Sequence, residues 1–218
     1  MIPLGDASRR PLTFPIVTVL LIVVNALFFL LELADGETVI AQWALVPARI
    51  TAGQAYLTIL TSMFLHGGWT HILGNMLFLW VFGPQIEDVM GPMRYLLFYL
   101  VSGVIATAAQ ILVDPSSMIP QLGASGAIAG VMGAFLITYP RDRIRTILIF
   151  GWFMRVTRVP AIILVGFWFL MQLFNSLGAL ADVQSGGVAY MAHIGGFIFG
   201  ALTARLFESR LRLLQRGL

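Results

Sequence analysis

The stretch LGASGAIAGVMGAFLITY, residues 122–139, is apolar almost throughout and rich in glycine and alanine. An apolar run of about 20 residues is long enough to cross a lipid bilayer as a helix. Ser125, Ala129 and Gly133 follow one another at intervals of four residues and therefore share one face of that helix. Small residues on one face let a second helix approach closely inside a membrane. We therefore predict a membrane-spanning helix over 122–139 that packs tightly against a neighbour and carries a serine near its start.

The rest of the chain has the same apolar character. Hydrophobic residues make up 59% of the 218 residues and charged residues only 11%, whereas soluble domains contain about 45–50% apolar and about 25% charged residues. The sequence therefore predicts an all-α polytopic membrane protein, with six transmembrane helices in a single domain over residues 1–218. The predicted spans are approximately 14–33, 65–82, 95–113, 122–139, 159–180 and 188–207.

The basic residues predict the orientation of these spans. All thirteen are arginine, and arginine is concentrated in the cytoplasmic segments of membrane proteins. If the first span starts inside, only Arg49 lies outside, so both termini are expected in the cytoplasm. The net charge of +3 then reflects topology, and no nucleic-acid partner is expected. The arginines expected inside are Arg9, Arg10, Arg94, Arg141, Arg143, Arg145, Arg155, Arg158, Arg205, Arg210, Arg212 and Arg216.

Two other segments are apolar but unsuited to spanning. Residues 147–153 lie among arginines and are expected at the cytoplasmic interface, while residues 38–60 are expected in or on the outer leaflet. The first span lacks a small-residue cleavage site, so it is interpreted as a retained helix rather than a signal peptide.

Polar side chains at membrane depth are costly and are functional candidates by default. None of the ten acidic residues falls in the middle of a predicted span. His71, Asn75, Ser125 and His193 all lie near the outer ends of the second, fourth and sixth spans, which run from outside to inside. Three helices are thus predicted to bring these four side chains to similar depths. Other polar residues within spans are Asn25, Ser102, Gln110, Gln172, Asn175 and Ser176.

These residue types suit nucleophilic catalysis. A serine hydroxyl becomes a nucleophile when a base removes its proton, and His193 is the candidate base and later general acid. No acid is predicted to orient His193, so a dyad is the simplest interpretation. The oxyanion that forms needs hydrogen-bond donors, which backbone N–H groups near Ser125 and the side chains of His71 and Asn75 would provide.

Three motifs carry a family resemblance over nearly the whole chain. They are FLHGGWTHILGN at residues 64–75, GASG at 123–126 and AHIGG at 192–196. With them the chain resembles the bacterial rhomboid proteases. The resemblance implies a six-helix core, Ser125 as nucleophile, His193 as base, and an oxyanion site from the Ser125 backbone with His71 and Asn75. It also implies substrates cleaved in or near a transmembrane segment, with no metal or other cofactor.

The chain matches or departs from the family pattern at three further places. Glu87 resembles the family's structural acidic residue in the loop after the second helix. Many rhomboids have a Trp-Arg pair in the first outer loop, where residues 54–58 here read QAYLT. Some members place an aromatic residue one turn after the serine, where this chain has Ala129. Loop anchoring is therefore expected to differ, and His193 is expected to rely on other packing.

The sequence also has to be compared with functions other than intramembrane proteolysis. A catalytically inactive rhomboid-like protein that binds client helices is the main alternative. A metal site using His66, His71 and His193 lacks an H-E-x-x-H motif, and a transporter would be expected to carry central charges. Cysteine is absent, which excludes disulfides and thiol nucleophiles. The partners expected are the lipid bilayer and transmembrane protein substrates, and the sequence indicates no particular oligomeric state.

The expected substrates follow from the environment of the serine. A membrane helix pairs its own backbone groups, so it must open before a peptide bond reaches Ser125. Substrates with glycine, proline or polar residues near the outer end of the span are therefore expected, with a small residue before the cut. The glycine-containing loop 181–189 is predicted to be a movable cap over the site.

Overall fold

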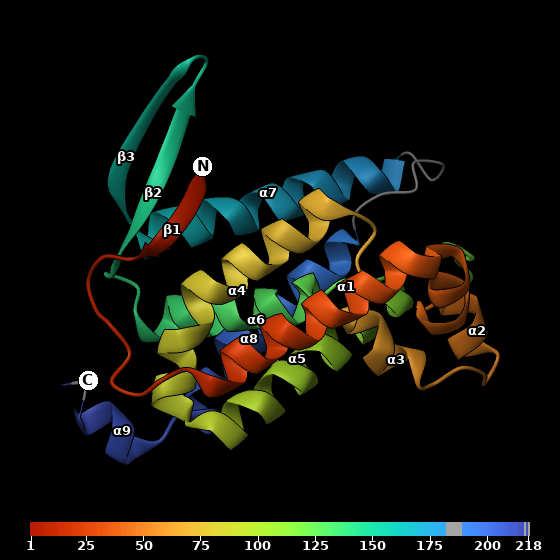
Figure 1. Ribbon diagram of the computed structural model, residues 1–218, viewed down its shortest axis with the longest axis horizontal. Helices are drawn as coiled ribbons and strands as arrows, with labels where there is room; N and C mark the ends of the chain where they lie inside the picture. Colours follow the sequence, from red (N-terminus) through yellow and green to blue (C-terminus); the bar gives the residue numbers. More distant parts are fainter. Residues whose placement is uncertain (182–188, 216, 218) are drawn as a thin grey trace.

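The computed structural model describes residues 1–181, 189–215 and 217, and most of them are helical. Within this part of the chain, six long helices form a bundle (Figure 1). The loop predicted as a cap lies mostly at 182–188, outside the described residues. The long helices are α1 (Ile16–Trp43), α4 (Trp69–Met90), α5 (Pro92–Val113), α6 (Ser125–Thr138), α7 (Ala161–Ala181) and α8 (Tyr190–Phe207).

Short elements lie at the two ends of this bundle. The segment between α1 and α4 contains α2 (Pro47–Thr51), α3 (Thr58–Thr61) and the 3₁₀ turn η1 (Ser62–Phe64), and it lies at one end. Both chain termini, the strands and α9 (Arg210–Gln215) lie at the opposite end (Figure 1).

Each long helix corresponds to one predicted span, but α1 and α4 end well beyond the predicted residues 33 and 82. The helix α1 continues past a non-helical residue, Asp35, to Trp43. The helix α4 begins after Gly68 and continues through Pro84 to Met90. Proline normally ends or kinks a helix because it has no N–H group and its ring crowds the preceding turn. The prediction therefore stopped at residue 82, and it wrongly placed Glu87 in a loop.

Two of the described helices, α1 and α5, are long and apolar enough to cross a membrane by length and composition. The helix α6 and residues Ala161–Ser176 of α7 are also apolar but shorter. Many large apolar side chains are exposed on the outside of the bundle, whereas aromatic side chains such as Phe82, Tyr95 and Phe135 are fully buried inside it.

The all-α prediction is wrong at the end that carries the termini. Three antiparallel strands form a sheet in the order β1 (Ile2–Asp6), β2 (Arg143–Phe150) and β3 (Phe153–Pro160). Isoleucine, valine and threonine recur in β2 and β3 and favour extended backbone, and Gly151 turns the chain with φ of +59°. The segment 147–153, expected only to lie at the interface, is the outer half of this hairpin.

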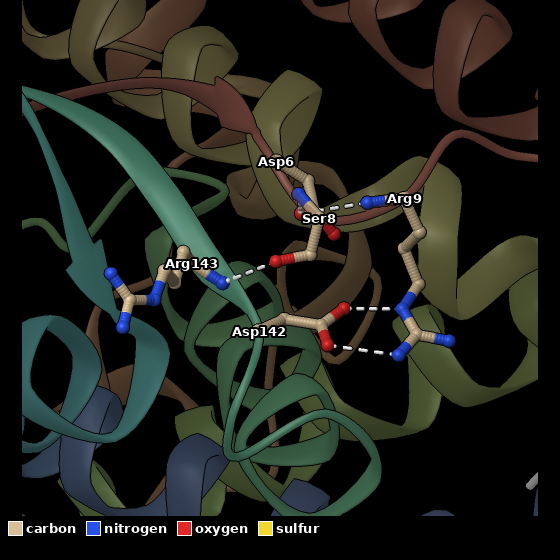
Figure 2. A network of polar contacts seen from close by, with 5 residues as sticks. All are labelled: Asp6, Ser8, Arg9, Asp142 and Arg143. Carbon is tan, nitrogen blue, oxygen red and sulfur yellow. Dashed lines mark hydrogen bonds and ion pairs between the residues drawn. The ribbon is translucent and has the colours of Figure 1, made fainter.

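Polar contacts fix the base of the hairpin to the N-terminal segment (Figure 2). The guanidinium of Arg9 pairs with the carboxylate of Asp142, and the Ser8 hydroxyl accepts the Arg143 N–H at 2.7 Å. Asp6 accepts the Ser8 N–H at 2.6 Å, and burial raises the pKa of Asp6 to about 6. The N-terminal strand is therefore held to the segment that follows α6.

Glu87 joins α4 to the start of α1. Its carboxylate accepts the backbone N–H of Val17 at 2.9 Å, and both the N–H and the hydroxyl of Thr18 at 2.8 Å. The first N–H groups of a helix have no partner within the helix, so a carboxylate at this position caps α1. Glu87 is fully buried, which agrees with the structural role that the resemblance implied.

The helices α6 and α8 pack with their backbones in contact. A Cβ atom added at Gly196 would lie 2.1 Å from the carbonyl oxygen of Gly126, and one added at Gly200 would lie 1.9 Å from that of Gly130. Only glycine fits where two helix backbones meet this closely. The small residues of both helices therefore set the separation of the elements that carry Ser125 and His193.

Candidate active site

Ser125 is the first residue of α6, and the turn before it depends on Gly123. Gly123 has φ of +126°, which side chains of L-residues disfavour, and an added Cβ would lie 2.8 Å from Nε2 of His71. The first helical hydrogen bond of α6 runs from the Ile128 N–H to the Ala124 carbonyl, at 3.0 Å. The N–H groups of residues 125–127 therefore belong to the unpaired first turn of the helix.

His193 lies in the first turn of α8 and faces the serine. Its Nε2 atom is 2.6 Å from the Ser125 Oγ atom, within hydrogen-bond distance. The imidazole is buried, with 8% of the residue exposed. The fourth and sixth predicted spans thus bring together the two side chains expected to act as nucleophile and base.

Two side chains of α7 complete the surroundings of His193. The Oε1 atom of Gln172 is 2.8 Å from His193 Nδ1, and the Trp168 ring centroid is 5.8 Å from that of His193. The sequence did not assign either residue to the site. Gln172 was recognisable only as one of several polar residues at membrane depth, and Trp168 as one of many aromatic residues in apolar stretches. Trp168 provides the aromatic neighbour that Ala129 does not.

His71 and Asn75 lie one turn apart on α4, on the other side of the serine turn. The His71 Nδ1 atom accepts the Gly67 N–H at 3.3 Å, so the neutral ring carries its proton on Nε2, the atom that lies close to Gly123. The Nδ2 atom of Asn75 is buried, and no acceptor contacts it among the described residues. The His71 ring therefore presents an N–H donor beside the start of α6, and Asn75, one turn further along α4, has a buried amide N–H group without an acceptor among the described residues.

His66, the third histidine, belongs to the scaffold of this region. Its backbone N–H donates to both carboxylate oxygens of Glu32, at 3.0 and 2.9 Å, and its ring lies edge-on to that of His71. Across residues 1–181, 189–215 and 217, no group of three or more His, Cys, Asp or Glu side chains is arranged to hold a metal ion.

A small pocket adjoins Ser125 between α5, α6 and the segment before α4. Its walls are formed mainly by small or flexible side chains. They come from Leu45, Ser62, Met63, Gly103, Ala106, Thr107, Gln121, Leu122, Gly123, Gly126, Ala127, Ala189 and Ala192.

The fold and this site define a helical membrane protein in which a partly buried serine contacts a buried histidine. A comparison with protein families shows which family of membrane proteins this is. The family model of the rhomboid domain matches residues 53–210. The chain belongs to the rhomboid family. This confirms the resemblance that the three motifs indicated.

Curated relatives agree with the family assignment. The chain is 34% identical over 197 residues to rhomboid protease GluP of Bacillus subtilis (strain 168), covering 87% of this chain and 34% of that protein. It is 28% identical over 204 residues to the putative rhomboid protease YdcA of the same organism, covering 90% of this chain and 92% of that protein. Presenilin-associated rhomboid-like protein, mitochondrial, of Bos taurus is 30% identical over 151 residues, which are 65% of this chain and 36% of that protein.

Proposed function

We propose that this protein is an intramembrane serine endopeptidase that hydrolyses peptide bonds in or near transmembrane segments. The observation that carries the proposal is the 2.6 Å contact between Ser125 Oγ and His193 Nε2 in an apolar helical bundle. Relatives named as proteases support the same activity. The proposal includes six transmembrane helices in one domain over residues 1–218, both termini in the cytoplasm of a bacterial cell, and a site that opens to the outer side.

The proposed reaction uses the site residues in sequence. His193 Nε2 removes the Ser125 hydroxyl proton as Oγ attacks the scissile carbonyl carbon, and the carbonyl oxygen becomes an oxyanion. N–H groups at the start of α6, with His71 and Asn75, stabilise that charge. The imidazolium then protonates the leaving amine, which leaves an acyl-enzyme on Ser125. Water, deprotonated by His193, attacks the ester, and the serine recovers its proton.

The pocket beside Ser125 supports a preference for a small residue before the cut. Gly103 and Ala106 form part of its wall, and an added Cβ at Gly103 would lie 2.1 Å from the terminal carbon of Met63. A large substrate side chain would therefore meet Met63. The proposed substrates are membrane proteins whose helices open readily at the outer end, because a closed helix shields its peptide bonds.

Reaction with a fluorophosphonate probe tests the proposed function. The phosphorus atom accepts attack by an activated serine and fluoride leaves, so we expect one covalent adduct, on Ser125, located by mass spectrometry of the purified protein. His193→Ala should remove the reaction, and EDTA should not change its rate. An unlabelled protein, or an adduct confined to another serine, would contradict the proposal and favour the inactive, helix-binding alternative.

The oxyanion site makes a separate prediction for His71→Ala and Asn75→Ala. Each variant should lower kcat by about 10²-fold and leave KM nearly unchanged, because donors to the oxyanion act mainly in the transition state. Steady-state cleavage of a transmembrane substrate in detergent measures both constants. A rise in KM alone would make these side chains substrate-binding groups instead.

A further inference from the structure

Gln172 contacts the face of His193 that points away from the serine. The Oε1 atom of Gln172 lies 2.8 Å from His193 Nδ1, and Ser125 Oγ lies 2.6 Å from Nε2. The three side chains form one chain of contacts across α7, α8 and α6. Gln172 is buried, with 9% of the residue exposed.

This contact selects one tautomer of the imidazole. An amide oxygen can only accept, so Nδ1 must carry the proton that it donates to Gln172. The lone pair of the neutral ring is then on Nε2, where it can accept the Ser125 proton. Without a fixed acceptor at Nδ1, the ring is free to adopt the other tautomer, whose Nε2–H faces the serine and cannot act as a base.

An amide suits this position better than the carboxylate of a soluble serine protease. A carboxylate buried at membrane depth carries a large desolvation cost. The Gln172 oxygen accepts the Nδ1 proton without a formal charge, and it continues to accept when the ring becomes an imidazolium. Trp168, one turn earlier on α7, restricts the ring from a second side.

We propose that Gln172 is a positioning residue that fixes the tautomer and orientation of His193, so that the pair acts as a neutral Ser-His-Gln relay. The proposal rests on the protease function proposed above. It makes the base depend on α7 as well as on α6 and α8.

Three variants of the full-length protein test this role with a transmembrane substrate. Gln172→Met keeps the side-chain length but replaces the amide oxygen with a thioether, which is only a weak acceptor, and Gln172→Glu keeps an acceptor oxygen. Gln110→Met is the matched control, because the Gln110 amide also supports α8, through the Ala192 N–H at 3.2 Å, but is not bonded to His193. Since a general base contributes about 10²–10⁴-fold, we expect Gln172→Met to lower kcat by at least about tenfold with KM unchanged.

The expected pattern is a smaller loss of kcat in Gln172→Glu than in Gln172→Met, because the glutamate keeps an acceptor oxygen at a desolvation cost, and a near wild-type kcat in Gln110→Met. The ¹⁵N chemical shifts of His193 should report the Nδ1–H tautomer in the unmodified protein and a mixture in Gln172→Met. Wild-type kcat in Gln172→Met, or an equal loss of kcat in Gln110→Met, would overturn the proposal. If the unmodified protein neither cleaves substrate nor reacts with the fluorophosphonate, the proposed protease function is wrong. The ¹⁵N chemical shifts of His193 would still show whether its hydrogen bond to Gln172 exists.

Discussion

Ser125→Ala and His193→Ala are each expected to lower cleavage of a transmembrane substrate by at least about 10⁴-fold. Removing one member of a nucleophile and base pair that acts as a unit removes nearly all of its catalysis. The 2.6 Å contact between the two side chains indicates such a unit. Cleavage in proteoliposomes, followed by gel electrophoresis and mass spectrometry of the products, measures the effect.

Ser102→Ala provides the matched control for loss of a buried hydroxyl. Ser102 is fully buried on α5 and lies outside the proposed catalytic groups, so this variant should cleave at close to the normal rate. All three variants should elute as folded protein and unfold at similar temperatures. Substantial turnover by folded Ser125→Ala protein would rule out the serine mechanism.

Among Gly→Ala substitutions in the bundle, Gly200→Ala is expected to lower the stability of the protein most. The new Cβ would lie 1.9 Å from the Gly130 carbonyl oxygen, and that atom belongs to a helix backbone that cannot move alone. Overpacking typically costs 1–3 kcal/mol and occasionally more, and a backbone clash between two helices should cost about 3 kcal/mol or more. Separating α6 from α8 would also lengthen the Ser125 to His193 contact, so activity should fall with stability.

Gly166→Ala is the control for this substitution. Gly166 also lies inside a long helix, α7, but an added Cβ would have no atom within 4 Å. Alanine is favoured over glycine in a helix by roughly 1 kcal/mol, so this variant should be as stable as the unmodified protein or slightly more stable. Thermal unfolding in detergent, with cleavage measured in parallel, compares the two variants. Equal behaviour would mean that α6 and α8 are not in backbone contact.

The helices and the Ser125 to His193 contact could be predicted because their signals are local or repeat along the chain. Apolar run length identified the six long helices, and matching depths in three of them made His71, Asn75, Ser125 and His193 candidates, of which Ser125 and His193 are in contact. Gln172 could not be assigned in the same way. Its role depends on the rotation of α7 about its axis, which hydropathy does not report, and a buried amide in a membrane helix is often only a packing contact.

The sheet was missed for a different physical reason. The strand β2 alternates arginine with β-branched residues only over its first half, and its second half, from Ile147, is uniformly apolar. Its partner β1 is five residues long and lies at the far end of the sequence. A pairing between such distant segments leaves no periodic pattern within either one. The continuation of α4 beyond Pro84 was likewise decided by tertiary packing, since residues 81–90 are all buried.

The pairing of β1 with β2 has a consequence for biosynthesis. Ile2 pairs with Ile147, so the first strand must wait until most of the chain has been made. At about 5–20 residues per second, that delay is on the order of 10 s. During this time the residues of β1 remain without their partner strand, within reach of chaperones and proteases. Pairing of β1 with β2 would then be a late step of folding, and it would join β1 to a segment synthesised well after it.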